Sequence, residues 1–133
     1  FDIQSQRVID QLDARIFVET FFNAYTYPYA TMSPSLEQDL EQLRKRYCTP
    51  SFLRGKYAAI KQEYLEDGES IDPLINCADF DAFWYPSISI DSIDSLTFRI
   101  GYDTDDAKGW RKDIKVMVRR ERGRFLLSDI EAK

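Results

Sequence analysis

Tyrosines and aspartates are the side chains of this chain that could transfer a proton, because its 133 residues include no histidine. Proton transfer needs at least a tyrosine hydroxyl beside a desolvated carboxylate, since burial can raise the pKa of an aspartate towards neutral pH. The candidates are Tyr57 or Tyr64 together with Asp79 or Asp81. The alternative for both aspartates is a capping or turn role, which Asp performs commonly.

Aromatic residues recur along the whole chain and could line a deep cavity between helices and a sheet. They are Phe17, Phe21, Phe22, Tyr25, Tyr57, Tyr64, Trp84, Phe98, Tyr102 and Trp110. Ordinary core packing is the alternative, because aromatic side chains bury large areas in any fold. If the cavity is open, we expect Tyr57, Asp79 and Trp84 to bind its ligand.

The two cysteines, Cys48 and Cys77, allow one pairing, and their spacing fits neither a redox motif nor a zinc site. In an oxidising compartment a Cys48–Cys77 disulfide is predicted, which would stabilise the fold by about 3 to 4 kcal/mol in the chain-entropy model. Two buried free thiols are the alternative. Without histidine, neither a Cys–His nor a Ser–His–Asp nucleophile is available.

The segment DTDDAKG resembles a calcium loop only superficially. Its aspartates are Asp103, Asp105 and Asp106, but the sixth position is Lys108 instead of Gly and the twelfth is Ile114 instead of Glu. We therefore reject a calcium-binding loop. Glycines do not cluster into a phosphate-binding loop either, so no metal and no cofactor is predicted.

A basic run follows, with seven cations against two acids, and alternation places Arg111, Lys115 and Arg119 on one side of a strand. Such a stripe could bind phosphates or an acidic partner. The alternative is that charged side chains cover a solvent-facing strand and discourage edge pairing. The net charge of −5 and the lack of an aromatic stacking pattern argue against nucleic acid as a partner.

No apolar stretch is long enough to span a bilayer, so we expect contact with a membrane only through an anchor removed from the N-terminus. The chain begins at Phe1 and has no methionine before Met32. We therefore expect that a segment has been removed from its N-terminus, either by a signal peptidase or by design.

Apolar spacing of three and four residues predicts three helices in the first half. They run from about Arg7 to Tyr25, from a Ser35–Gln38 capping box to near Cys48, and from Thr49-Pro50 to about Leu65. A loop should separate the first two, and the acidic connection over residues 62–81 should be irregular.

Alternating apolar residues predict four strands in the second half, over residues 84–90, 96–102, 110–122 and 125–130. Their short connections require antiparallel neighbours and a meander with one solvated face. The chain should therefore form a single α+β domain over residues 1–133, with three N-terminal helices packed on a curved four-stranded antiparallel sheet.

Two short segments carry a resemblance to known proteins: Tyr47-Cys48-Thr49, and the run from Asp72-Pro73 to Asp79. They resemble a family of small secreted or lipid-anchored bacterial domains of unknown function. The element order is similar to that of the nuclear transport factor-like superfamily, which includes ketosteroid isomerase and scytalone dehydratase. The resemblance implies a cone-like fold, a pocket mouth between the first and third helices and the concave sheet, and a place in the periplasm or at the outer surface of the cell envelope.

Enzymes of that superfamily use a His–Asp pair or a tyrosine with acidic partners, and no catalytic residue can be carried over to this chain. We expect a non-catalytic module of the bacterial cell envelope that binds a small molecule or a protein. The alternative is an isomerase, dehydratase or hydrolase that uses Tyr and Asp in a cone-shaped pocket. An interior filled by its own Phe and Trp side chains would argue against the enzyme.

Overall fold

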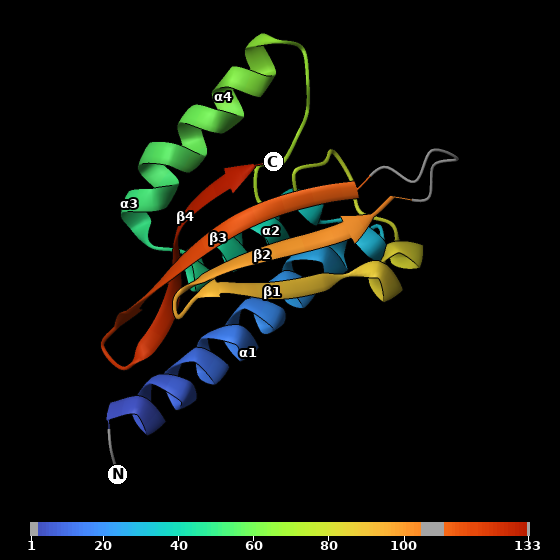
Figure 1. The fold of residues 1–133 in the computed structure, drawn as a ribbon. Helices are drawn as coiled ribbons and strands as arrows, with labels where there is room; N and C mark the ends of the chain where they lie inside the picture. The colour runs from blue at the N-terminus through green and yellow to red at the C-terminus, as the bar shows by residue number, and fades with distance from the viewer. Residues whose placement is uncertain (1–2, 105–110, 133) are drawn as a thin grey trace.

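The computed structural model describes residues 3–104 and 111–132, and these form helices followed by one sheet (Figure 1). In chain order the elements are α1 (Ile3–Ala30), α2 (Leu36–Tyr47), α3 (Pro50–Phe52), the π-helical turn η1 (Leu53–Tyr57), α4 (Ala58–Glu66), the 3-10 helix η2 (Ala82–Ser87), β1 (Ser89–Asp94), β2 (Thr97–Asp103), β3 (Arg111–Glu121) and β4 (Arg124–Ala132).

The sheet confirms the predicted α+β class. Its strands lie in the order β1-β2-β3-β4, each antiparallel to the next, as short connections require. Ile114, Val116 and Val118 are buried, while the residues between them on β3 are more exposed, so the sheet has one packed and one solvated face. Helices α1 and α2 cover the packed face, and α4 extends past the sheet on the side of β4 (Figure 1).

Helix α1 continues beyond the predicted end at Tyr25 and passes Pro28 before it ends at Ala30. Proline removes one backbone hydrogen bond from a helix and is tolerated best near an end, and here only two more helical residues follow. The backbone N–H of Ser33 then donates to the carbonyl of Pro28 at 2.9 Å, which closes the turn. The loop predicted between the first two helices is therefore shorter than expected.

Helix α2 has Ser35 as its N-cap residue, but the predicted capping box with Gln38 is wrong, because the Ser35 side chain makes no capping hydrogen bond. The hydroxyls of Ser33 and Ser35 instead donate to the carboxylate of Asp39, at 2.6 and 3.1 Å. A carboxylate is a stronger hydrogen-bond acceptor than a neutral group, and in the first turn it also interacts favourably with the helix dipole.

The third predicted helix is present as a continuous helical stretch, Pro50–Glu66, made of α3, η1 and α4. Thr49 caps it as expected: its side-chain oxygen accepts from the backbone N–H of Phe52 at 3.2 Å, and Pro50 occupies the first helical position. The π-helical turn at Leu53–Tyr57 was not predicted. Such turns are rare in proteins, and a large share of those that do occur lie at functional sites.

The first predicted strand is partly wrong, since residues Ala82–Ser87 form a 3-10 helix and β1 begins only at Ser89. Asp81 is the N-cap of this helix, where its carboxylate accepts from the N–H of Phe83 at 2.9 Å. Asp81 thus has the capping role that was the alternative to a catalytic one. Trp110, expected to begin the third strand, and Asp105, Asp106 and Lys108 of the rejected calcium loop lie outside the described residues.

An aromatic cluster fills the space between α1 and the sheet. The ring centroid of Phe22, on α1, lies 6.0 Å from that of Phe80 and 6.0 Å from that of Tyr102, on β2. The ring of Trp84, on η2, stacks on Tyr102 with a centroid distance of 5.8 Å. Phe22, Phe80 and Tyr102 are at most 1% exposed. This part of the interior, where a cone-like fold would hold its pocket, is packed with the chain's own side chains.

Both cysteines are free thiols, which corrects the predicted Cys48–Cys77 disulfide. Cys48 is buried at the end of α2, where its backbone pairs with Leu127 of β4. Cys77 instead pairs through its backbone with Asp72, in the connection before η2. Burial raises the pKa of the Cys48 thiol to about 12, so it stays protonated and unreactive at neutral pH.

Candidate functional site

A buried carboxylate, that of Asp72, anchors the connection between α4 and η2 to helix α1. One of its oxygens accepts hydrogen bonds from the hydroxyls of Tyr25 at 2.6 Å and Tyr29 at 2.7 Å. The other accepts from the backbone N–H of Leu74 at 3.0 Å. Tyr25 and Tyr29 are four residues apart and so lie on one face of α1, which lets both hydroxyls meet at one carboxylate.

Arg44 of α2 continues this network towards the surface. Its Nη1 donates to the hydroxyl of Tyr25 at 2.8 Å, and its guanidinium carbon lies 5.2 Å from the centroid of the Tyr57 ring. The ammonium of Lys61, on α4, lies 5.9 Å from the same centroid. In the described part of the chain, neither Arg44 nor Lys61 forms an ion pair with a carboxylate.

Tyr57 belongs to the π-helical turn and is only 7% exposed. Its hydroxyl is buried and makes no hydrogen bond of standard geometry among the described residues, although the Tyr25 hydroxyl lies close enough to affect its pKa. Leaving a buried polar group unpaired costs about 1 to 3 kcal/mol. The hydroxyl of Tyr57 is therefore a local cost to stability, at the point where α2 faces the Pro50–Glu66 stretch.

The tyrosines of this network hold their protons tightly. Burial raises the pKa of the Tyr25, Tyr29 and Tyr57 phenols above its ordinary value, and the negative charge of Asp72 raises each of them further. At neutral pH their hydroxyls can donate hydrogen bonds but cannot serve as bases.

Two adjoining hollows lie between α2 and the Pro50–Glu66 stretch, and we call them together the α2–α4 cleft. Their volumes are about 380 and 280 Å³, and Arg44, Lys61 and Leu65 line both. The first is otherwise lined by Glu41, Lys45, Leu53, Tyr57, Ala58 and Gln62, and the second by Tyr29, Leu36, Glu37, Leu40, Ser70, Ile71, Asp72 and Ala78. Apolar walls with a few convergent polar groups are typical of small-molecule sites.

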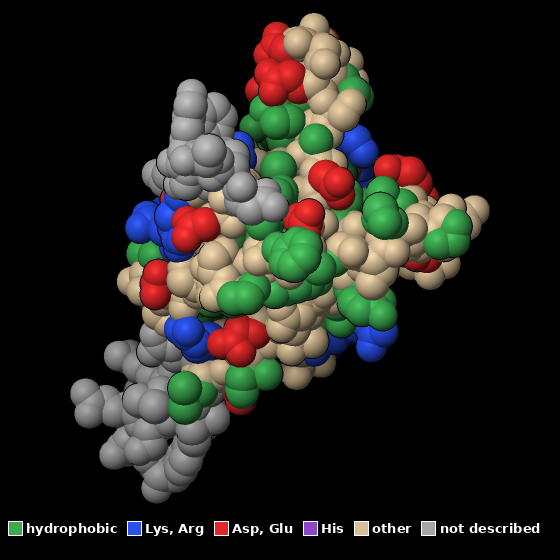
Figure 2. Space-filling view, turned by 90° about the vertical axis from the view of Figure 1, so that its right-hand side faces the viewer, with side chains coloured by type: hydrophobic (Ala, Val, Ile, Leu, Met, Phe, Trp, Pro, Cys, Tyr) green, Lys and Arg blue, Asp and Glu red, His purple; other side chains and the backbone are tan. Residues whose placement is uncertain are grey.

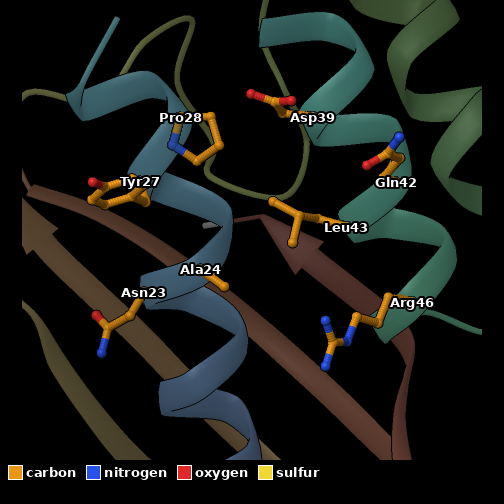
Figure 3. A pocket seen from close by; sticks show the side chains of 8 residues that line it. All are labelled: Asn23, Ala24, Tyr27, Pro28, Asp39, Gln42, Leu43 and Arg46. Atoms are coloured by element: carbon orange, nitrogen blue, oxygen red, sulfur yellow. The ribbon is translucent and has the colours of Figure 1, made fainter. Parts of the chain in front are cut away.

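A third hollow, of about 670 Å³, lies between α1 and α2 (Figure 3). Leu43 and Arg46 of α2 extend into it towards α1, and Pro28 borders it on the other side (Figure 3). Its acid, Asp39, already accepts from two serine hydroxyls. This hollow is about as large as the two hollows of the α2–α4 cleft together, but fewer polar side chains line it.

Of the three residues predicted to bind a ligand, only Tyr57 lies in the α2–α4 cleft. Asp79 is exposed, and its carboxylate accepts from the neighbouring N–H of Phe80 at 2.8 Å. Trp84 packs into the aromatic cluster, where its indole nitrogen is buried without a partner. Tyr64, the other candidate for proton transfer, is half-buried on α4.

The sequence did not single out Asp72, Arg44 or Lys61. Asp72 precedes a proline and was interpreted as a turn, while Arg44 and Lys61 stand among other charges on helices. The one local signal was at Asp72, which begins one of the two segments that resemble the bacterial family. Its partners on α1 are 47 and 43 residues away in the chain, and only the tertiary fold brings them together.

Among the residues that the structure describes, no three His, Cys, Asp or Glu side chains are grouped closely enough to hold a metal ion. Over the same residues, none of the helices combines the length and the apolar character that a membrane span needs. Apolar side chains also reach the surface (Figure 2), and among the side chains whose exposure is described the most exposed large ones are Met32 at 86% and Phe83 at 84%.

The fold defines an α+β domain in which helices cover one face of a four-stranded antiparallel meander. A protein of unknown function from Bacteroides thetaiotaomicron has a similar crystal structure, with a TM-score of 0.78 and 18% sequence identity. The similarity covers 98% of this chain and 99% of the other, so the whole fold is shared. No protein-family model matches the chain, and no curated protein matches it significantly.

Proposed function

We propose that this chain is a non-catalytic binding module of the bacterial cell envelope that holds a small molecule in the α2–α4 cleft. The observation that carries this proposal is the position of Arg44 and Lys61. Both line the two hollows, both lie beside the ring of Tyr57, and neither forms an ion pair with a carboxylate in the described structure. Cationic groups that converge on a hollow and form no ion pair there favour an anionic ligand as the partner.

The alternative function is an isomerase, dehydratase or hydrolase, and the contact of Tyr25 and Tyr29 with Asp72 supports it. Three features weigh against it. The tyrosines retain their protons, the oxygens of Asp72 already accept three hydrogen bonds, and the aromatic cluster fills the space between α1 and the sheet. We therefore place binding before catalysis.

The envelope location and the cone-like, nuclear transport factor-like class belong to the same proposal. Their support is the resemblance of the two short segments at Tyr47 and Asp72, together with a structural neighbour that comes from a bacterium. Fractionation of cells that express the complete gene tests the location. Recovery of the protein in the cytosol would contradict it.

A crystallographic fragment soak tests the binding site. Acidic, neutral and basic fragments of similar size are soaked separately, and we expect hits against Arg44, Tyr57, Lys61 or Leu65. Hits only in the hollow between α1 and α2, at residues such as Leu43 and Pro28, would move the proposed site. Hits in neither place would contradict the proposed function.

A further inference from the structure

We propose that the ligand of the α2–α4 cleft carries a single carboxylate, which Lys61 and the free N–H groups of Arg44 bind over the ring of Tyr57. This inference rests on the proposed function and names the chemistry of the ligand for the same cleft. It follows from the charges of the cleft, from the shape of its walls and from the local backbone.

The charges indicate an anion. The guanidinium of Arg44 has five N–H donors, and the structure shows one of its nitrogens bound to the hydroxyl of Tyr25. The ammonium of Lys61 has three donors and no ion pair in the described structure. Both cations are half-buried beside one aromatic ring, so they repel each other in a medium less polar than water. An anion between them would relieve that repulsion.

The acids of the cleft limit the charge of the ligand. Glu41 is occupied by Lys45 at 3.1 Å, and Asp72 is occupied by its three hydrogen bonds. Glu37 lines the inner hollow together with Arg44 and Lys61. Glu37 and Asp72 line only the inner hollow, where they already balance Arg44 and Lys61, so a doubly charged phosphate would be repelled there. The outer hollow has Arg44, Lys45 and Lys61 against Glu41 and can therefore take one carboxylate.

The walls of the cleft indicate an apolar body next to that carboxylate. Leu53, Ala58 and Leu65 line the outer hollow, and Leu36 and Leu40 line the inner one. The outer hollow, of about 380 Å³, is at the lower end of the range for small-molecule sites, and the inner one, of about 280 Å³, is just below it. A ring or a short alkyl chain of a few carbon atoms fits this space better than a peptide or a sugar chain.

The backbone gives an independent observation. The π-helical turn Leu53–Tyr57 places Leu53 and Tyr57 on the outer hollow. This turn lies between the three-residue α3 and the nine-residue α4. The coincidence of a rare turn with the two unpaired cations is what a binding site would produce.

Three probes of one shape test the inference: phenylacetate, phenylacetamide and phenethylamine, which present a carboxylate, a neutral amide and an ammonium. Each is titrated into the intact protein and followed by amide chemical shifts of α2 and of residues 50–66. We expect phenylacetate to shift the amides around Arg44 and Lys61, with a Kd about tenfold below that of the amide, and we expect no binding of the amine.

Two variants complete the test. Lys61→Gln should raise the Kd for phenylacetate about tenfold. Lys56→Gln, which removes the same charge from an ion pair with Asp129, should leave the Kd unchanged. If the amide or the amine binds the same cleft as tightly, the carboxylate inference fails while the binding function stands. If no probe and no soaked fragment enters the cleft, both fail.

Discussion

Two regions of the molecule present several basic side chains, and they differ in whether the central basic residues form ion pairs with acids. On the solvated face of the sheet, Arg111 pairs with Asp103 at 3.3 Å, Lys115 with Glu131 at 3.5 Å, and Arg119 with Glu121 at 3.1 Å. In the α2–α4 cleft, Arg44 and Lys61 have hydrogen-bond and ring contacts but no such pair in the described structure.

The comparison shows that a basic run in a sequence is a poor guide to a site. The stripe on β3 is the longer run, yet each of its three predicted members faces an acid and is solvated. The two cleft cations come from different helices and are far apart in the sequence. Unpaired charge beside apolar walls, rather than the number of charges, distinguishes the cleft.

Removal of the carboxylate below the cleft should have the largest effect. Asp72→Ala leaves the hydroxyls of Tyr25 and Tyr29 and the N–H of Leu74 without their acceptor, so we expect a loss of about 3 to 5 kcal/mol in the free energy of unfolding. Urea denaturation of the two proteins measures it. Asp79→Ala is the control, because Asp79 is exposed, and it should cost about 0.5 kcal/mol or less.

A loss below about 1 kcal/mol for Asp72→Ala would show that the tyrosines find other partners. The carboxylate would then not anchor the connection between α4 and η2 to α1. The cleft would differ less from the solvated face of the sheet in how much its charged groups stabilise the fold.

The next effect compares one arginine from each region. Arg44→Ala removes the donor to Tyr25 and the guanidinium beside the Tyr57 ring, so it should destabilise the ligand-free protein by about 2 kcal/mol. Arg119→Ala breaks an exposed ion pair with Glu121 and should cost about 0.5 kcal/mol or less. Thermal and urea unfolding measure both, and equal losses would contradict the distinction between the two regions.

These two regions also show what the sequence could predict. Local signals were reliable: Thr49-Pro50 begins a helix, and the alternation around Val116 marks a strand with one buried face. The alternation of Trp84, Pro86 and Ile88 misled, because three apolar residues are too few to distinguish a strand from the 3-10 helix that Asp81 caps and that ends at Ser87, before Ile88.

Long-range contacts could not be predicted. A buried Asp72 and an exposed Asp79 have the same residue type and lie in one short segment, and only the packing of α1 against that segment distinguishes them. Arg44 and Lys61 are likewise ordinary helix charges until α2 and α4 are placed side by side. Tyr57 was predicted because an aromatic hydroxyl is distinctive without knowledge of its neighbours, and its role in binding stays a prediction.

Alkaline pH should weaken the cleft network more than the solvated face. Burial, with the charge of Asp72, raises the phenol pKa of Tyr25, Tyr29 and Tyr57 in the folded state. The free energy of unfolding is therefore unaffected by their ionisation below the unfolded pKa near 10 and falls as the pH rises above it, by about 1.4 kcal/mol per pH unit for each tyrosine. Tyr57→Phe should make this fall shallower by that amount.

Unfolding in urea at several pH values between 8 and 11.5 measures the slopes. Tyr27→Phe is the matched control, since Tyr27 is 63% exposed and its removal should leave the slope unchanged. The same slope for Tyr57→Phe and the parent protein would mean that Tyr57 ionises as readily in the folded state as in the unfolded one.

The smallest expected effect has the opposite sign. At pH 7, Tyr57→Phe removes a buried hydroxyl that has no partner in the described structure and keeps the ring beside Arg44 and Lys61. Because the unpaired hydroxyl is a cost, the variant should be more stable by up to about 1 kcal/mol, as measured by urea denaturation. Tyr29→Phe is the contrasting variant: its hydroxyl binds Asp72 at 2.7 Å, so its loss should destabilise the protein by about 1.5 kcal/mol or more. Destabilisation by Tyr57→Phe of the same size would show that its hydroxyl has a partner, such as an ordered water, and would remove the local cost from the argument for a binding site.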